Sequence, residues 1–402
     1  MKGRLPTGVD RVCLAYIRQY RSRARVFVQA GRLGGVFSPD ASQKLFDLLM
    51  SPGEDFFRRA TRIMALSPPL PWFGRSSGRG GFLLNIGHSG LDSSFYSNRQ
   101  AGGRGARPIF MVHDLIPFSH PEFSREGEDL RHVARMATVL RTAAGVVTNS
   151  SFTLEVLKDF ARARGAAMPP AVVAPLASGL PRCRQPIAET GAAGPGTSWP
   201  GSPAGRTQTD NLGRAASKAP LDHPCFVMVG TIEPRKNHWM ILQVWRRIVE
   251  RLGRAAPGLV IIGQRGWECE NVIDILERGA TLSDFVHEAS GCSDEELVWR
   301  LRRARALIFP SFIEGYGLPL IEALSNGVPV IASNLPVFRE IAGDIPDYLD
   351  PLDGIGWLER IVEYCRPESA RRAAQMQRLS GFTPPSWQAH FEAVETLLDR
   401  IG

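Results

Sequence analysis

The chain of 402 residues has 44% hydrophobic and 22% charged residues, a composition typical of globular proteins, and it is long enough for two domains with full cores. No apolar stretch reaches about 18 residues and no secretory signal is visible, which argues against a membrane-spanning helix and against export. The six cysteines are scattered without metal-ligand spacing, which argues against a zinc site and a disulfide framework and favours a reducing cytosol.

The first 180 residues alternate between strand and helix patterns. The expected elements are a helix at 9–20, a strand at 25–31, a helix at 43–51, a Pro/Gly-rich loop at 67–81, strands at 81–90 and 109–117, a helix at 130–145, a strand at 145–150, a helix at 152–165 capped by Ser150 or Ser151, and a strand at 171–177. This alternation predicts a parallel sheet covered on both faces.

The composition changes over residues 181–221 to Pro, Gly, Ala, Ser and Thr with few large apolar side chains. Such a segment buries too little surface to offset its ordering, so we expect a flexible linker or insertion between a first domain at 1–180 and a second at 222–380. Strand–helix repeats resume in the second domain, and residues 381–402 hold a final helix that we expect to pack back on the first domain.

The most informative segment is EGYGLPLIE, which follows the apolar run ALIFPS. An apolar strand there leads into a Gly-rich turn that opens a helix, and such a turn brings backbone N–H groups close to an anionic ligand. Glu314 in the turn and Glu322 about two helical turns further on can face one cleft and accept hydrogen bonds from sugar or ribose hydroxyls. Two solvated glutamates are the alternative, and Gly315 and Gly317 argue against it.

A second segment, FVMVGTIEPRKNH, is predicted to be a buried strand, Gly230, and a turn that ends in Arg235, Lys236 and Asn237 before another helix. Cations at a helix start are poorly placed for the helix dipole but well placed to neutralise phosphates. A solvated Arg-Lys pair is the alternative.

These residues carry a family resemblance. The segments GTIEPRKNH, LVIIGQRGW, ALIFPSFIEGYGLPLIEAL and GVPVIASNLPVFREIAG resemble, in order and spacing, the donor-binding half of retaining glycosyltransferases of the GT-B fold, family four (group 1). VHDLIPFSHPEF, GVVTNSSFT and GRLPTGVDRV resemble the acceptor half of the bacterial polysaccharide-assembly branch, in which mannosyltransferases are frequent. The resemblance implies an α/β protein with two Rossmann-like parallel-sheet domains that face a cleft.

In this family GRLPTGVDRV follows a first strand, and here only Met1 and Lys2 precede it. We therefore expect either a misplaced start site or a first domain without its usual first strand, a loss that would remove a large buried area from the sheet.

The resemblance also implies roles for the motif residues. The donor is a GDP- or UDP-linked sugar that acts as a co-substrate, with no separate cofactor. Arg235 and Lys236 would bind its diphosphate in place of a metal ion, because no DxD-like motif stands where such enzymes need it. Glu314 would hold hydroxyls of the transferred sugar and Glu322 the ribose. The backbone of the Gly-rich turn would support the sugar or the phosphates at Gly315, Tyr316, Gly317 and Leu318.

Six weaker candidates complete the predicted donor site, namely Gly230, Thr231, Gly263, Gln264, Val286 and His287. Many relatives place an arginine where Thr231 stands, so the phosphate role rests on the later cation pair. For the last four candidates, a place in a core strand is the favoured alternative.

In the acceptor half, the resemblance places His113 at a strand end facing the donor sugar. The adjacent Asp114 would orient its ring or accept the acceptor proton. A satisfied core histidine is the alternative. Gly8 is assigned to an approach to the donor phosphates, with a simple turn equally compatible.

Charge is unevenly spread. Residues 1–180 hold 24 Lys and Arg against 13 Asp and Glu, a net +11, and the remainder hold 24 against 27, a net −3. A basic first half suits an anionic membrane surface or a phosphate-bearing acceptor, and a merely solubilising arginine-rich surface is the alternative. The arginines are dispersed, so nucleic acid is not an expected partner.

The sequence therefore predicts a metal-independent hexosyltransferase, cytoplasmic or peripheral on the cytoplasmic membrane face. It would move mannose from GDP-mannose to a lipid-linked oligosaccharide or polysaccharide precursor in exopolysaccharide or lipopolysaccharide biosynthesis. A GT-B UDP-sugar epimerase and a truncated, inactive assembly partner are the alternatives.

Overall fold

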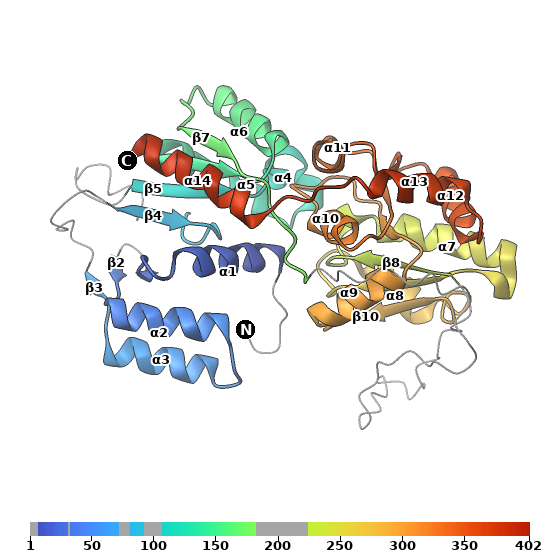
Figure 1. Cartoon of the computed structure of the whole chain (residues 1–402), viewed down its shortest axis with the longest axis horizontal. Helices are drawn as coiled ribbons and strands as arrows, with labels where there is room; N and C mark the ends of the chain where they lie inside the picture. Colours follow the sequence, from blue (N-terminus) through green and yellow to red (C-terminus); the bar gives the residue numbers. More distant parts are fainter. Residues whose placement is uncertain (1–6, 31–32, 72–80, 92–106, 182–223) are drawn as a thin grey trace. The chain divides into compact units, whose positions relative to one another are not determined.

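The computed structural model describes residues 7–30, 33–71, 81–91, 107–181 and 224–402. The predicted linker at 181–221 lies, from residue 182 on, outside the described residues. The chain divides into two compact units, the first made of Met1–Gly179 with Pro385–Gly402 and the second of Leu180–Pro384 (Figure 1).

The first unit is built on a parallel sheet of order β4-β5-β6-β7. Its strands are β4 (Phe82–Asn85), β5 (Arg107–Val112), β6 (Gly145–Thr148) and β7 (Ala171–Val173). The helices associated with this sheet are α1 (Gly8–Tyr20), α4 (Ile116–Ser119), α5 (Glu128–Thr142), α6 (Ser151–Ala163) and α14 (Trp387–Ile401). All four residues of β6 are buried, as expected for a strand covered on both faces.

Local signals explain where several helices start. Thr7 and Asp10 form a capping box at α1, in which each side chain bonds the backbone N–H of the other. The cap of α6 is Ser150, whose hydroxyl accepts the N–H of Thr153, so the earlier of the two predicted caps is the one in place.

The last helix, α14, belongs to the first unit although it follows the whole second unit in sequence (Figure 1). Its buried His390 bonds the Tyr16 hydroxyl at 2.9 Å and, through the other ring nitrogen, the carbonyl of Ala174 at 3.0 Å. Gly145 is packed so closely against this helix that a Cβ there would lie 3.1 Å from Ile401.

Part of the first unit differs from the predicted parallel sheet. The strand predicted at 25–31 exists as β1 (Phe27–Ala30), but it joins β2 (Leu33–Val36) and β3 (Leu70–Pro71) in a separate antiparallel sheet. The predicted helix at 43–51 is α2 (Pro39–Met50). A further helix that the sequence analysis missed, α3 (Phe56–Leu66), buries no residue completely.

The second unit holds a six-stranded parallel sheet of order β10-β9-β8-β11-β12-β13. The strands are β8 (Cys225–Val229), β9 (Gly258–Ile262), β10 (Val286–Ala289), β11 (Leu307–Phe309), β12 (Val330–Ser333) and β13 (Asp347–Leu349). The helices are α7 (His238–Leu252), α8 (Glu270–Arg278), α9 (Asp294–Arg303), α10 (Leu318–Ser325), α11 (Pro336–Ala342), α12 (Gly354–Cys365) and α13 (Ala370–Leu379). The α/β class predicted from the sequence is confirmed.

One face of this sheet is closed by α7 and α12. Trp245, Trp357 and Tyr364 are completely buried in one cluster with strand residues such as Phe226 and Ile308. Burial of these large rings stabilises the unit because it removes extensive apolar surface from water.

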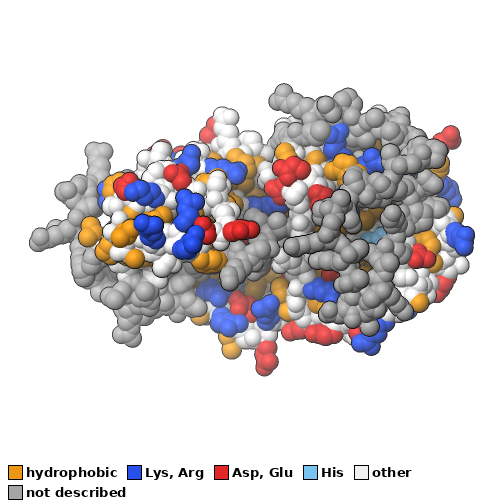
Figure 2. Space-filling view, turned by 90° about the horizontal axis from the view of Figure 1, so that it is seen from below, with side chains coloured by type: hydrophobic (Ala, Val, Ile, Leu, Met, Phe, Trp, Pro, Cys, Tyr) orange, Lys and Arg blue, Asp and Glu red, His pale blue; other side chains and the backbone are white. Residues whose placement is uncertain are grey.

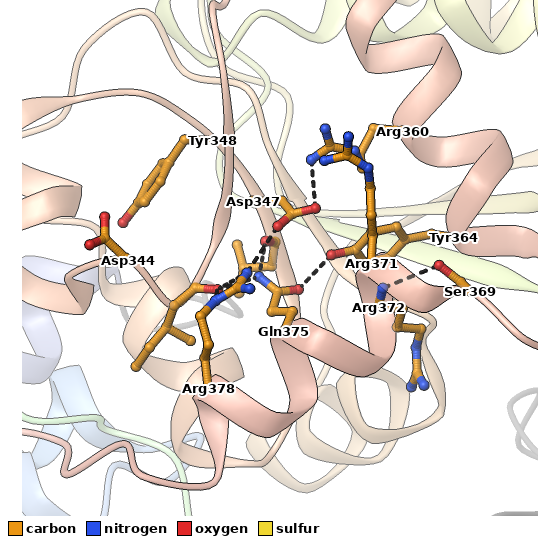
Figure 3. A network of polar contacts seen from close by, with 12 residues as sticks. Asp344, Asp347, Tyr348, Arg360, Tyr364, Ser369, Arg371, Arg372, Gln375 and Arg378 are labelled. Carbon is orange, nitrogen blue, oxygen red and sulfur yellow. Dashed lines mark hydrogen bonds and ion pairs between the residues drawn. The ribbon is translucent and has the colours of Figure 1, made fainter.

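A buried polar network fixes α13 to the far edge of the sheet (Figure 3). The amide of Gln375, which is fully buried, donates to the carbonyls of Val330 at 2.7 Å and Ile345 at 3.0 Å and accepts from the Tyr364 hydroxyl at 2.9 Å. Beside it Asp347 pairs with Arg360 and Arg378 from the two neighbouring helices. Gln375 thus joins the Val330 carbonyl to the Tyr364 hydroxyl, while the Ile345 carbonyl also accepts from Arg378.

Replacing Gln375 by Met is expected to lower the free energy of unfolding of the second unit by about 2–4 kcal/mol, because the buried bonds of the amide to the Val330 carbonyl and the Tyr364 hydroxyl are lost. Chemical denaturation measures this. Gln377→Met, at an exposed position of the same helix, is the matched control. Equal stability of the two variants would contradict the assigned role of the network.

Candidate functional site

The segments singled out in the sequence meet at the carboxyl edge of the second sheet. The segment after β8 lies between those after β9 and β11. The N–H of Ile232 donates to the Gln264 carbonyl at 2.9 Å, and the N–H of Phe312 donates to the Arg235 carbonyl at 2.8 Å. Carboxyl edges of open parallel sheets are where ligands bind in such folds.

Four charged side chains form a cluster at this edge. Arg235 contacts the carboxylate of Glu233 and that of Glu314, each at 2.6 Å. Lys236 forms an ion pair with the second oxygen of Glu314. The Lys236 and Glu314 side chains are 8% and 7% exposed, whereas that of Arg235 is 22% exposed. The cluster holds two cations and two anions, so its formal charge is zero.

Neutral contacts fix the position of these charges. The Ser311 hydroxyl donates to Glu314 at 2.8 Å. The ammonium of Lys236 lies over the Phe309 ring, 5.0 Å from its centroid, a favourable cation–π position. Asn237 adopts a left-handed backbone conformation before α7, and its side chain bonds the Pro351 carbonyl.

Electrostatics favour an ionised Glu314. Burial raises the pKa of this carboxyl, but the charges of Arg235 and Lys236 lower it by more, so that its pKa is about 2. Burial is also the main cause that raises the pKa of Glu233 and lowers the pKa of Lys236. Of the two carboxylates, Glu314 is therefore the one held firmly as an anion.

The glycines of the site serve two different purposes. Gly317 has a φ of +110°, and a Cβ there would lie 2.7 Å from the Phe338 ring, so the turn before α10 requires glycine. A Cβ on Gly263 would lie 1.9 Å from the Gly230 carbonyl oxygen. Gly263 is thus required by the close approach of two strand ends, a structural role.

The remaining donor-site candidates are distributed as follows. Gly315, Tyr316, Gly317 and Leu318 lead from Glu314 into α10. This helix begins at Leu318, so only one helical turn, and not the expected two, lies between Glu314 and the buried Glu322. Thr231 is half-buried beside the exposed Gln264. Val286 begins β10 opposite Leu259, and His287 follows, so both lie toward the amino end of the sheet, away from the carboxyl edge.

In the first unit, His113 is buried at the end of β5. Its ring nitrogen Nε2 donates to the Ile86 carbonyl at 2.7 Å, while Asp114 accepts the N–H of Ile116 at 3.0 Å. The ring is therefore oriented by Ile86, not by Asp114 as expected. Burial lowers the pKa of His113, which favours the neutral ring. Gly8 is the first, exposed residue of α1.

Three members of these constellations were missed in the sequence. Glu233 and Ser311 bond the predicted cation and carboxylate directly. His88, whose ring centroid is 5.4 Å from that of His113, adds a second histidine at the sheet edge of the first unit. Glu233 and Ser311 lie within the two segments singled out in the sequence, and His88 lies near the end of the strand predicted at 81–90. Only their contacts in the structure distinguish them from ordinary turn residues.

Comparisons with known proteins bear on the family and the fold of the chain. Residues 211–345 match the family model described as glycosyl transferases group 1. The chain carries a group 1 glycosyltransferase domain. The O-antigen chain mannosyltransferase B of Escherichia coli is 34% identical over 160 residues, which cover 40% of this chain and 42% of that protein. The serotype-specific mannosyltransferase WbdA of Escherichia coli is 32% identical over 240 residues, 59% of this chain and 27% of that protein. The chain thus spans less than half the length of these curated relatives.

Solved structures show that the chain has the GT-B fold. A UDP-forming α,α-trehalose-phosphate synthase from Burkholderia vietnamiensis aligns with a TM-score of 0.54 at 12% identity, covering 94% of this chain and 91% of that one. A sucrose-phosphate synthase from Thermosynechococcus elongatus aligns with a TM-score of 0.51 at 17% identity, covering 76% and 70%. The predicted fold class and the predicted family resemblance of this glycosyltransferase domain are confirmed.

The group 1 domain also contains a buried histidine that responds to acid. His238, the first residue of α7, is 2% exposed, and neither ring nitrogen has a hydrogen-bond partner among the described residues. Burial and the nearby charge of Lys236 lower the pKa of His238 from 6.5 to about 3. The unfolded chain therefore takes up this proton first, and the stability that neutral His238 contributes is lost as the pH falls from 6.5 toward 3.

We predict that His238→Phe makes the second unit less sensitive to acid, since about 1.4 kcal/mol per pH unit of that loss comes from this ring. The measurement is urea denaturation at several pH values within the window. Trp239→Phe, at the exposed neighbouring position, is expected to keep the wild-type slope. If both variants show the same slope, His238 is not the titrating group.

Proposed function

We propose that the protein is a retaining glycosyltransferase that moves a hexose, mannose from GDP-mannose as the leading candidate, from a nucleotide sugar to a growing polysaccharide precursor. The observation that carries this proposal is the buried charge cluster of Arg235, Lys236 and Glu314 at the carboxyl edge of a group 1 domain. The names of the relatives, which are O-antigen and serotype-specific mannosyltransferases, support the choice of sugar and of pathway class.

The two cations act on the leaving group in this proposal. Departure of the nucleoside diphosphate develops negative charge, and preorganised cations stabilise it without a reorganisation step. Arg235 keeps 22% of its side chain exposed and is the first cation that an incoming diphosphate reaches. The cluster is neutral overall, so it has no excess positive charge to attract a diphosphate. The phosphates must therefore share or replace the contact between Arg235 and Glu233.

Glu314 remains ionised because of its low pKa. Beside its bonds to Arg235, Lys236 and Ser311, its carboxylate keeps about one acceptor position for a sugar hydroxyl. Glu322 is assigned to the ribose. The backbone of Gly315–Gly317 is assigned to the sugar or the phosphates, because it leads into the start of α10 and the amino end of a helix favours anions.

The acceptor is assigned to the first unit, with neutral His113 as the residue that meets the transferred sugar. We take the acceptor to be lipid-linked and the protein to act in the cytoplasm at the inner face of the membrane. Within the described residues no helix has both the length and the apolar character to cross a bilayer, so such a contact would be peripheral.

The proposal is tested by incubating the purified chain with a panel of sugar nucleotides and measuring nucleotide release. GDP-mannose is expected to be turned over, and faster when a lipid-linked acceptor is added. The proposal fails if no donor is turned over and no nucleoside diphosphate binds.

Replacing Lys236 by Gln is expected to weaken binding of GDP by about ten- to a hundredfold, the loss typical of one charge-assisted contact. Isothermal titration calorimetry measures it. Arg339→Gln, which breaks the exposed pair with Asp344 in the same unit, is the control and should bind like the wild type.

Because Lys236 is buried in an ion pair, its loss also leaves Glu314 with one cation fewer. The double variant Lys236→Gln/Glu314→Gln removes both charges and separates the two effects. Recovery of the thermal midpoint without recovery of GDP binding supports the ligand role, whereas recovery of both assigns Lys236 to stability alone.

A further inference from the structure

One ionisable group of the charge cluster has no task in the proposed reaction. Glu233 lies just before Arg235 in the turn after β8, and its side chain is only 3% exposed. Many Asp and Glu side chains lie at the surface beside Lys and Arg, as one face of the molecule shows (Figure 2), and there water and salt screen their charges. Glu233 lacks this screening, so its charge acts strongly on its neighbours.

Glu233 is held to Arg235 by charge and not by a well-formed hydrogen bond. Its Oε1 lies 2.6 Å from Nε of Arg235, but this buried oxygen accepts no hydrogen bond of regular geometry from the described residues. Nη1 of the same guanidinium donates to the Glu314 carboxylate at 2.6 Å and to the Ile313 carbonyl at 3.3 Å. Of the two carboxylates that contact Arg235, Glu233 is therefore the one that an incoming anion displaces more easily.

Backbone contacts fix the place of Glu233 independently of its charge. Its carbonyl accepts the N–H of Lys236 at 3.1 Å, and the N–H of the preceding Ile232 donates to the Gln264 carbonyl at 2.9 Å. The segment after β9 also lies close by, since a Cβ on Gly266 would be 3.5 Å from that of Glu233. The carboxylate can therefore change its charge without releasing the turn.

The charge of Glu233 decides the net charge of the cluster. With Arg235, Lys236 and Glu314 ionised, the cluster is neutral when Glu233 is an anion and carries one positive charge when Glu233 is protonated. A diphosphate that binds Arg235 takes from Glu233 its paired cation. A buried carboxylate that loses its cation is strongly disfavoured as an anion, and protonation relieves this cost.

We propose that Glu233 is a proton-linked counter-ion, which pairs with Arg235 in the free protein and takes up a proton from solvent when a diphosphate replaces it there. The proton forms the O–H of the neutral acid, and no other covalent bond changes. The identity of the anion as the diphosphate of a sugar donor rests on the proposed function. Burial already raises the pKa of Glu233 although the charges of Arg235 and Lys236 lower it, so the loss of one contact favours protonation further.

The pH dependence of binding follows from this step. Between the pKa of Glu233 in the free protein and its higher pKa in the complex, binding takes up a proton, so the affinity weakens as the pH rises. Two other groups near the cluster do not supply this effect. His238 on α7 has a pKa of about 3 and stays neutral, and Arg265 pairs with carboxylates of α8 and β10. Lys236, whose pKa burial lowers, is the competing site of proton uptake.

The test is isothermal titration calorimetry of GDP-mannose without acceptor, in pairs of buffers that differ in ionisation enthalpy, at pH values from about 5 to about 8. The phosphates of GDP-mannose do not titrate in this range, so the counted protons belong to the protein. The wild type is expected to take up about half to one proton at the pH of largest uptake and to lose up to about tenfold in affinity per pH unit there. Glu233→Gln is expected to take up none, and to bind about tenfold more tightly than the wild type at the alkaline end.

The matched control is Glu359→Gln, at an exposed position on α12 of the same unit, which should behave like the wild type. Thermal midpoints check that both variants remain folded, and a merely structural Glu233 would change the midpoint but not the proton count. The proposal is overturned if the wild type binds GDP-mannose without proton uptake. It is also overturned if Glu233→Gln takes up as many protons as the wild type, which would assign the proton to Lys236.

Titrations with inorganic pyrophosphate separate this proposal from the proposed function. Pyrophosphate itself titrates in this range, so the proton count is the difference between the wild type and Glu233→Gln. Such a difference with pyrophosphate, together with an absence of GDP-mannose binding, would reject the function and leave the proton-linked counter-ion standing. Donor binding without the difference would reject the counter-ion alone, and binding of neither anion would reject both.

Discussion

The contact of the buried Glu314 carboxylate with the buried Lys236 and the half-buried Arg235 organises the carboxyl edge of the second unit. An isolated charge in such a place is strongly disfavoured, and here each ion of the set is tolerated only because the others are present. Two opposing effects act on Glu314. Burial raises its pKa, and the charges of Arg235 and Lys236 lower it by more, so that the pKa is about 2. The same contact connects the segment after β8 to the segment after β11. The pairing of these charges therefore also fixes the position of the two segments relative to each other.

The strand order explains why this contact forms where it does. From β8 the sheet continues through β9 and β10 on one side and through β11, β12 and β13 on the other. In open sheets of this kind, the loops that leave neighbouring strands in opposite directions separate at such a point. The positive-φ Gly317 before α10 and the close approach of Gly263 to Gly230 set the course of the backbone there. The topology of the sheet thus brings charged side chains from two separate segments to one edge.

Sequence reasoning found the second unit better than the first because its signals are local there. Apolar strands followed by glycine and by charged turns identify the edge residues, and Arg235, Lys236 and Glu314 indeed lie in contact. Partner choice is a tertiary property, so the bond of Glu233 to Arg235 and that of His113 to Ile86 could not be predicted from spacing. In the first unit, β2 (LGGV) carries two glycines and therefore shows no strand pattern, so the antiparallel hairpin was not predicted, and α3 shows only a narrow inward face.

The position of α14 has a consequence for how the molecule is made. This helix covers the first unit through His390 and through the tight contact of Gly145 with Ile401, yet the ribosome produces it after every element of the second unit. The surface of the first unit that α14 covers therefore stays exposed until synthesis of the chain ends. In nascent chains that stop before Trp387, the first unit should accordingly be cleaved by protease more readily than in the complete chain.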